Sequence, residues 1–393
     1  MPLRSALTAC LCALAAFSAT AAPYLPAKGS DVVERLPRRL DPVQQELQRL
    51  RARLAASPND VTLATDVARQ YIAAARRETD PRYLGYAQSA LAPWWAMPAP
   101  PNQVRLLRAT LLQSTHHFPE ALRDLDAIVV AEPDNPQAWL TRATVQTVRG
   151  DYEAATKSCA RLSSITSQLV SNSCIAGIGA MTGRAAASVN LLELTLRREA
   201  DADPGLQAWV LTLLAEILER RGNNAGAEAA YRRALALAPR ESYLTGAYAD
   251  YLLDQKRPAD VLELVAGQTR IDGLLLRHAL ALRQVPAQAV ALRAADAELN
   301  ARFNAAMQRG DTVHQREQAR YELHVRGNAK AALALAQKNW SVQKESADMR
   351  VLLEAALAAG DKAAAGPVLA WVDKHRVEDV AVQRLARQLK GGL

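Results

Sequence analysis

Apolar residues in the middle of the chain recur with a helical period, in short segments separated by polar turns. In the stretch 136–161, Trp139 and Ala143 fall on one face of a helix at i and i+4. Gly150 follows, and glycine ends a helix in a left-handed turn without steric cost. Asp151 is a suitable N-cap for a second helix. The pattern therefore predicts a helical hairpin.

The hairpin recurs in register along the chain, with small residues where paired helices would touch. In the expected first helices these are Ala109, Ala143, Gly177, Ala215 and Ala249. In the second helices they are Ala121, Ala155, Ala227 and Val261. The spacing is 34 residues, as from Ala109 to Ala143, except between Gly177 and Ala215, where about four residues are inserted. The chain is therefore expected to be an array of stacked hairpins.

This spacing resembles the tetratricopeptide repeat, whose period and residue pattern it matches. The best copy is Leu214–Pro239, with Leu214, Ala215, Gly222, Ala227, Tyr231, Ala234 and Pro239 at the pattern positions. Arg142, Gln146 and Ser188 depart from the pattern. The resemblance covers roughly residues 102–265, and it implies an all-α fold, a right-handed superhelical solenoid of antiparallel helix hairpins.

The flanking regions complete the expected organisation. Residues 1–21 form a targeting segment, 22–40 an extended basic arm, and 41–101 N-terminal helices with a degenerate first repeat. The core array spans 102–265, and 266–393 holds degenerate helical repeats and a capping helix at 378–390. The prolines of residues 92–101 predict a break without helix. Trp94 and Trp95 in that break would either be a recognition patch or cover the apolar end of a hairpin.

The N-terminus has the pattern of a secretory signal. Arg4 precedes an apolar run from Leu7 to Phe17, and Ala19-Thr20-Ala21 is a small-x-small cleavage site. A competing interpretation uses Cys10 as the lipid-modified residue of a lipoprotein. No later stretch has the 18 or so apolar residues of a membrane span. We therefore expect an exported protein, in the periplasm of a bacterium.

The net charge of +8 becomes +7 when Arg4 is removed with the signal. The dense basic region consists of Arg35, Arg38, Arg39, Arg49, Arg51 and Arg53. It is either a solvated face or a contact for an anionic membrane surface or polymer. Nucleic acid is not expected as a partner of an exported chain.

The sequence contains no arrangement that predicts an enzyme, a cofactor or a metal site. His116 and His117 are adjacent in a turn, and no further ligand stands at zinc-site spacing. His314 and His324 are ten residues apart on one expected helix and do not form a zinc motif. Gly177 and Gly179 lie inside a helical pattern, which indicates close helix packing instead of a dinucleotide site.

Cys159 and Cys174 are the cysteines that remain after the expected cleavage. An even number in an oxidising compartment is compatible with a disulfide, and the two predicted helices are neighbours. Two separate buried thiols are the alternative.

A peptide-binding groove is expected on the first helices, as the resemblance implies. On residues 207–220 and 242–254, one strip beside the apolar face carries Trp209, Thr212, Glu216, Glu219, Tyr243 and Asp250. The family's carboxylate-clamping version needs Lys and Asn on this face, and they are absent here. The strip predicts an extended partner segment with basic residues, and an ordinary solvated helix face is the alternative.

These features favour a non-catalytic, exported scaffold or adaptor that binds a protein or peptide. A structural or self-associating envelope protein is the second hypothesis, and an enzyme of unknown type is the third. The resemblance is to a fold that serves many partners, so it does not identify one.

Overall fold

The computed structural model describes Lys28 and residues 42–391. The chain divides into two units, residues 1–48 and 49–393, and each is considered by itself. The expected signal segment, its Cys10 alternative, and Arg35, Arg38 and Arg39 of the basic arm lie outside the described residues. In the first unit, the described structure is the start of a helix at Pro42.

The described residues from 42 onward form helices and turns, with no strand among them. The helices before residue 200 are α2 (Pro42–Ala56), α3 (Val61–Glu78), α4 (Arg82–Ala90), α5 (Ala92–Trp95), α6 (Asn102–Ser114), α7 (Phe118–Ala131), α8 (Pro136–Arg149), α9 (Tyr152–Leu162), α10 (Gln168–Met181) and α11 (Ala185–Arg198). The later ones are α12 (Pro204–Arg220), α13 (Asn224–Leu237), α14 (Ser242–Asp254), α15 (Pro258–Leu264), α16 (Asp272–Arg283), α17 (Ala289–Gln308), α18 (Gln315–His324), α19 (Ala329–Val342), α20 (Ser346–Ala359), α21 (Gly366–His375) and α22 (Val380–Lys390). Short 3₁₀ turns, Pro286–Gln288 and Ala363–Ala365, precede α17 and α21. None of these helices is both long and apolar enough to cross a membrane.

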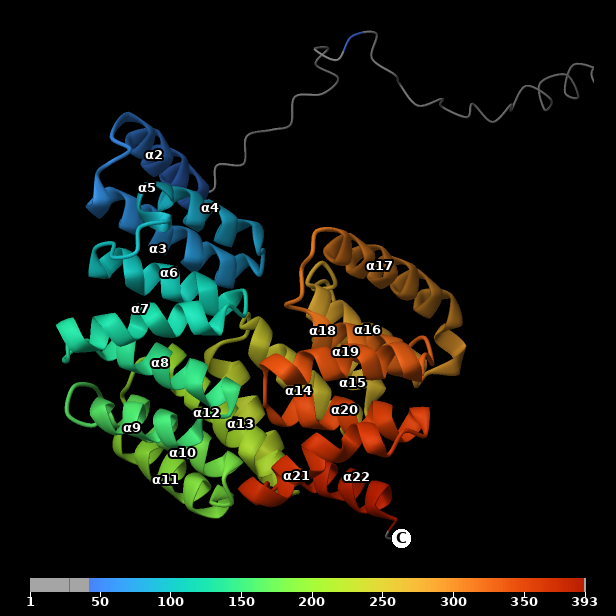
Figure 1. Ribbon diagram of the computed structural model, residues 1–393. Coiled ribbons are helices and arrows are strands. Elements are labelled where there is room, and N and C mark those ends of the chain that lie inside the picture. Colours follow the sequence, from blue (N-terminus) through green and yellow to red (C-terminus); the bar gives the residue numbers. More distant parts are fainter. Residues whose placement is uncertain (1–27, 29–41, 392–393) are drawn as a thin grey trace, which may run out of the picture. The chain divides into compact units, whose positions relative to one another are not determined.

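Successive helices pair as antiparallel hairpins, so the predicted all-α, tetratricopeptide-like solenoid is confirmed (Figure 1). Gly150 ends α8 with φ 82°, as the turn pattern predicts. Asp60 caps α3 through its side chain, which accepts from the Leu63 amide at 3.0 Å. Asp151 stands at the N-cap of α9 but makes no capping bond, because its carboxylate pairs with Arg149 at 3.2 Å.

The small residues predicted at helix contacts are buried, with one exception. Ala109, Ala143, Ala215, Ala249, Ala121, Ala155, Ala227 and Val261 are all at most 1% exposed. Gly177 is half-buried, and a Cβ built there would meet no atom within 4 Å. Gly179 is the close contact on α10 instead, since a Cβ there would lie 2.6 Å from the Ser188 hydroxyl. The repeat register predicted at Gly177 is therefore wrong, because Ala176 occupies the buried position.

The segment 92–101 contains a short helix, contrary to the prediction that its prolines exclude one. Pro93 lies in the first turn of α5, where a backbone N–H would have no hydrogen-bond partner within the helix, so proline is tolerated there. Trp94 is buried and Trp95 is half-buried, which fits a cover over the hairpin end better than an open recognition patch. Arg108 fixes the segment, because its Nη1 donates to the carbonyl oxygens of Trp95 at 2.6 Å and Met97 at 2.9 Å.

A disulfide joins Cys159 on α9 to Cys174 on α10, with 5.6 Å between the two Cα atoms. It links consecutive hairpins, as the bonded alternative of the sequence prediction requires. Cys159 is fully buried in a core cluster that also contains side chains of α19, α20 and α22. The same core therefore holds the middle of the repeat array and the C-terminal helices together.

The C-terminal helices pack against the turns of the earlier hairpins (Figure 1). The Lys344 amide donates to the Val148 carbonyl at 2.8 Å, and the Ala185 amide donates to the Glu378 carboxylate at 2.6 Å. The Trp371 ring lies directly against Gly150, and Val380 lies beside Gly222. In the second unit, the solenoid therefore folds back and contacts itself.

Candidate functional site

The first helices of the later hairpins meet across this fold-back through charged side chains. We call the surface that they form the inner face, and define it by Trp209 and Glu216 of α12, Tyr243 and Asp250 of α14, Arg320 of α18 and Arg350 of α20. Arg320 of α18 pairs with Asp250 of α14 at 2.7 Å. Arg350 of α20 bonds Asp254 of α14 at 2.7 Å, although the two residues are 96 positions apart.

Two aromatic side chains on the inner face are exposed. Trp209 is 44% exposed and Tyr243 is 62% exposed, and they lie one repeat apart on α12 and α14. The predicted third member between them, Thr212, is instead buried, and its hydroxyl donates to the Ala208 carbonyl at 2.7 Å. The open part of the predicted strip is thus aromatic.

The two glutamates of the predicted strip are held by tyrosines. The Tyr243 hydroxyl donates to Glu216 at 2.6 Å, and the Tyr231 hydroxyl donates to Glu219 at 2.8 Å. Burial raises the pKa of Glu216 above its usual range, and it raises the pKa of Glu219 to about 8. At neutral pH, Glu219 is therefore mostly a neutral acid and offers little charge to a basic partner.

Asp250 is held by two arginines. Arg277 Nη2 lies 2.5 Å from its Oδ2, and Arg320 Nη2 lies 2.7 Å from its Oδ1. Burial alone would raise the pKa of Asp250, but Arg277 and then Arg320 lower it well below its usual range. Its negative charge is thus already neutralised within the chain. The sequence did not indicate this pairing, since the two arginines come from α16 and α18.

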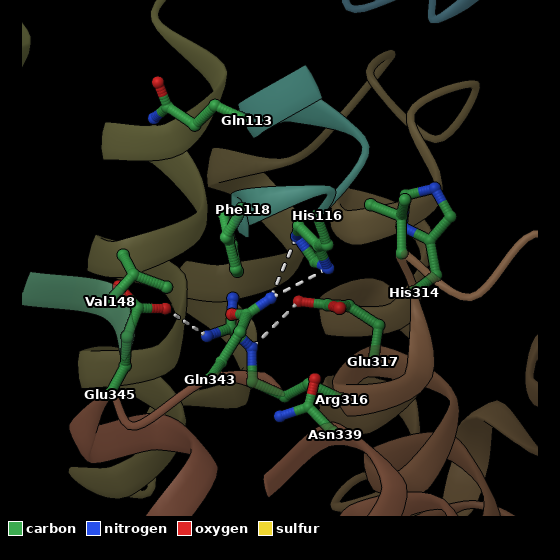
Figure 2. A pocket seen from close by; sticks show the side chains of 11 residues that line it. Gln113, His116, Phe118, Val148, His314, Arg316, Glu317, Asn339, Gln343 and Glu345 are labelled. Carbon is green, nitrogen blue, oxygen red and sulfur yellow. Dashed lines mark hydrogen bonds and ion pairs between the residues drawn. The ribbon is translucent and has the colours of Figure 1, made fainter. Parts of the chain in front are cut away.

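A cavity of about 290 Å³ opens where elements far apart in the sequence meet (Figure 2). His116 contributes from the α6–α7 turn, Val148 from the end of α8, and His314 from the start of α18. Gln343 and Glu345 contribute from the α19–α20 connection. The amide nitrogen of Gln343 lies 3.0 and 2.9 Å from the two ring nitrogens of His116.

Arg316 is the central charge of the cavity. Its Nε donates to Glu317 at 3.2 Å, and its Nη1 donates to Glu345 at 2.8 Å. Burial opposes ionisation of Glu317, but Arg316 lowers the pKa of that carboxyl to about 2, so it is charged at neutral pH. Asp348 does not line the cavity but lies 3.4 Å from Arg316, and because it is fully buried its pKa is raised to about 6.

His116 has a left-handed backbone conformation, with φ 61°. In the turns of the following hairpins the residue with the left-handed conformation is a glycine, at Gly150, Gly183 and Gly222. The His116 ring stacks on Phe118 with centroids 5.3 Å apart, and burial followed by the charge of Arg316 lowers its pKa. The sequence placed His116 correctly in a turn but gave no sign of Gln343 or Arg316 beside it.

The other histidines that the sequence offered as metal ligands do not come together in the described part of the chain. No group of three or more His, Cys, Asp or Glu there could hold a metal ion. His314 precedes α18 and His324 ends it, and His324 Nε2 lies 2.9 Å from Glu354 on α20.

No family model and no curated protein matches the chain. It is similar to solved structures of helical proteins, among them the following. PilW, a widely conserved type IV pilus biogenesis factor, is 15% identical over 72% of this chain and 97% of that chain, with a TM-score of 0.30. A tetratricopeptide repeat protein from Parabacteroides merdae is 13% identical over 74% and 98%, with a TM-score of 0.35. Human IFIT1, solved as a dimer with m7Gppp-AAAA, is 13% identical over 88% and 86%, with a TM-score of 0.40.

Proposed function

We propose that the protein is a non-catalytic, exported scaffold that binds an extended segment of a partner protein on its inner face. The observation that carries the proposal is the pair of exposed aromatic rings, Trp209 and Tyr243, on successive first helices. Trp209 has no aromatic partner and its side chain makes no hydrogen bond among the described residues. Exposed tryptophan and tyrosine are enriched where proteins bind one another.

Basic residues of the partner would pair with Glu216 and not with Asp250. Glu216 has only the Tyr243 hydroxyl as a direct partner, which a guanidinium could replace. Asp250 would have to release Arg277 and Arg320 first. A charge-assisted hydrogen bond contributes roughly 1.5–3 kcal/mol, so displacing two internal ones is unfavourable.

Export is the second part of the proposal. It rests on the signal-like sequence 1–21, and the Cys159–Cys174 disulfide supports it, since such bonds persist in oxidising compartments. N-terminal sequencing of the exported protein should begin at Ala22. A lipid-modified Cys10 would place the protein on a membrane instead.

Capture of partners from the native envelope fraction tests the binding surface. Trp209→Ala should lose the partner, because a central aromatic anchor contributes about 2 kcal/mol or more, or some thirtyfold in affinity. Leu237→Ala is the matched control, since Leu237 is 39% exposed but lies on the second helix α13. If Trp209→Ala and Glu216→Lys both bind every partner as wild type does, the partner binds elsewhere. Capture of RNA in place of protein would also overturn the proposal.

A further inference from the structure

The cavity at Arg316 has hydrogen-bonding capacity that the protein does not use. Among the described residues, the side chains of Gln113 and His314 line it without a hydrogen-bond partner in the chain. Arg316 uses Nε and Nη1 for its carboxylate partners, and each of Glu317 and Glu345 gives it one oxygen. Polar groups in such a place are normally satisfied, by water or by a ligand.

The charges of the cavity are unbalanced. The carboxylates that line the cavity are those of Glu317 and Glu345, and the guanidinium that lines it is that of Arg316, which also lies 3.4 Å from Asp348 behind the lining. Arg277 also acts on Glu317, but it is paired with Asp250, so these lining groups carry one negative charge in excess. His116 does not supply the missing positive charge at neutral pH, because burial lowers its pKa. Lys344 does not line the cavity, and its ammonium lies over the Trp340 ring and donates to the Trp340 carbonyl.

The remaining walls are apolar. Phe118, Val148 and Val313 line the same space. A volume of about 290 Å³ is just below the range for ligand pockets, roughly 300–1,000 Å³. The cavity therefore suits a small molecule or side chain with an apolar part and one charged end.

We propose that this cavity binds a small organic cation, an ammonium or guanidinium group on a short alkyl stem. The charged end bonds the oxygens of Glu317 and Glu345 that Arg316 leaves unused, and the stem lies against Phe118, Val148 and Val313. Two sources have this chemistry: a free amine, and a lysine or arginine side chain of a partner. Since the cavity joins the α6–α8 hairpins to α18–α20, the bound cation also ties these two parts together.

Calorimetric titration of the full chain with agmatine tests the proposal. Agmatine has the guanidinium on a four-carbon stem, with an ammonium at the far end of the stem, and butylurea is the analogue that lacks both charges. Agmatine should bind and butylurea should not. Glu317→Gln should weaken agmatine about ten- to hundredfold, as expected for loss of a charge-assisted hydrogen bond in this site. The variant should still fold, because Arg316 keeps Glu345 and Asp348 as partners. His314→Ala, which removes a side chain without a hydrogen-bond partner, should weaken agmatine less.

Glu263→Gln is the control, because Glu263 is exposed on α15 and does not line the cavity. Equal binding by Glu317→Gln and Glu263→Gln, equal binding of butylurea, or no agmatine binding at millimolar concentration would each overturn the proposal. Trp209→Ala should leave agmatine binding unchanged, so this test does not depend on the proposed partner. The blocked peptide acetyl-Gly-Arg-Gly-amide distinguishes the sources: if it binds with the same sensitivity to Glu317→Gln, the ligand is a partner's side chain. If only agmatine binds, the ligand is a free cation.

Discussion

Replacement of Gly150 by alanine tests whether the C-terminal helices pack on the hairpin turns. Gly150 has φ 82°, a conformation that costs an L-residue about 1–2 kcal/mol. A Cβ there would also lie within 3.0 Å of Cζ2 and Cη2 of Trp371, and 3.2 Å from Cγ of Lys344. Overpacking of this kind costs about 1–3 kcal/mol. We therefore expect Gly150→Ala to lower the free energy of unfolding by roughly 2–5 kcal/mol, the sum of both costs.

Gly360 is the matched control, because it has the same turn role without the contact. Its φ is 69°, and a Cβ there would meet no atom within 4 Å. Gly360→Ala should thus carry only the backbone cost. The difference between the two variants, about 1–3 kcal/mol, isolates the packing of Trp371 on the turn. Thermal unfolding followed by circular dichroism should resolve it, at about 1–2 °C for each kcal/mol in a chain of this length.

A double-mutant cycle with Trp371→Ala completes the test. Trp371→Ala removes the ring that clashes, so the double variant should be more stable than the sum of the single effects predicts. The reasoning is refuted if Gly150→Ala and Gly360→Ala are equally stable and the cycle is additive. In that case, α21 does not contact Gly150 in solution.

Three further predictions concern the core and its ionisation. Replacing Cys159 and Cys174 by serine should destabilise the fold by roughly 3 kcal/mol for a 15-residue separation. Thiol labelling of unfolded, unreduced protein that begins at Ala22, and so lacks Cys10 and Cys12, should find no free thiol. Ala227→Leu should cost about 1–3 kcal/mol in thermal unfolding because Ala227 is fully buried, whereas Ala225→Leu at an exposed position of the same helix should cost far less; equal effects would contradict the packing. The pKa of Glu219 in the folded protein is raised to about 8, so the folded protein binds the carboxyl proton of Glu219 more tightly than the unfolded chain does. The protonated carboxyl therefore contributes stability that is fully present below about pH 4.5 and is lost as the pH rises through 8. Glu219→Gln, which keeps an acceptor for Tyr231, should therefore gain stability relative to wild type between pH 5 and 9, and a constant difference over that range would rule out the shifted ionisation.

The hairpins could be predicted from the sequence because their signals are local. Each helix pair is specified by an apolar stripe, a turn residue and small residues at the contact, all within 34 positions of one another. Gly177 shows where this fails. Its spacing matched the pattern, but α10 places Ala176 at the buried position and leaves Gly177 half-buried, a difference of one residue that the 34-residue spacing does not reveal.

The inner face was predicted only in part, because its acidic side chains form ion pairs with residues that are far away in the sequence. Trp209 and Tyr243 are exposed as the helical spacing suggested. The partners of Asp250 are 27 and 70 residues away, on helices whose relation to α14 no periodicity reveals. Thr212 was placed on the open strip, but the helix α12 contacts α10, α11, α13 and α14, so more of its circumference is buried than in a helix with one neighbour.

The hairpin turns nevertheless contain a sequence signal for the long-range contacts. Four described residues other than glycine have positive φ, namely Thr79, His116, Lys256 and Arg376. The Thr79 hydroxyl bonds Ser242 at 3.2 Å, and His116 meets Gln343, over separations of 163 and 227 residues. Arg376 lies against Gly183.

Because a non-glycine residue in this conformation costs about 1–2 kcal/mol, a turn that keeps one has a use for its side chain. Three of these four turns contact a segment far away in the sequence, and His116 does so at the wall of the cavity. Glycine turns also meet distant segments, since Gly150 lies against Trp371 and Gly222 beside Val380. The turns at Thr79 and His116 therefore add a side-chain bond to the contact, to Ser242 and to Gln343, and the contact alone does not require them.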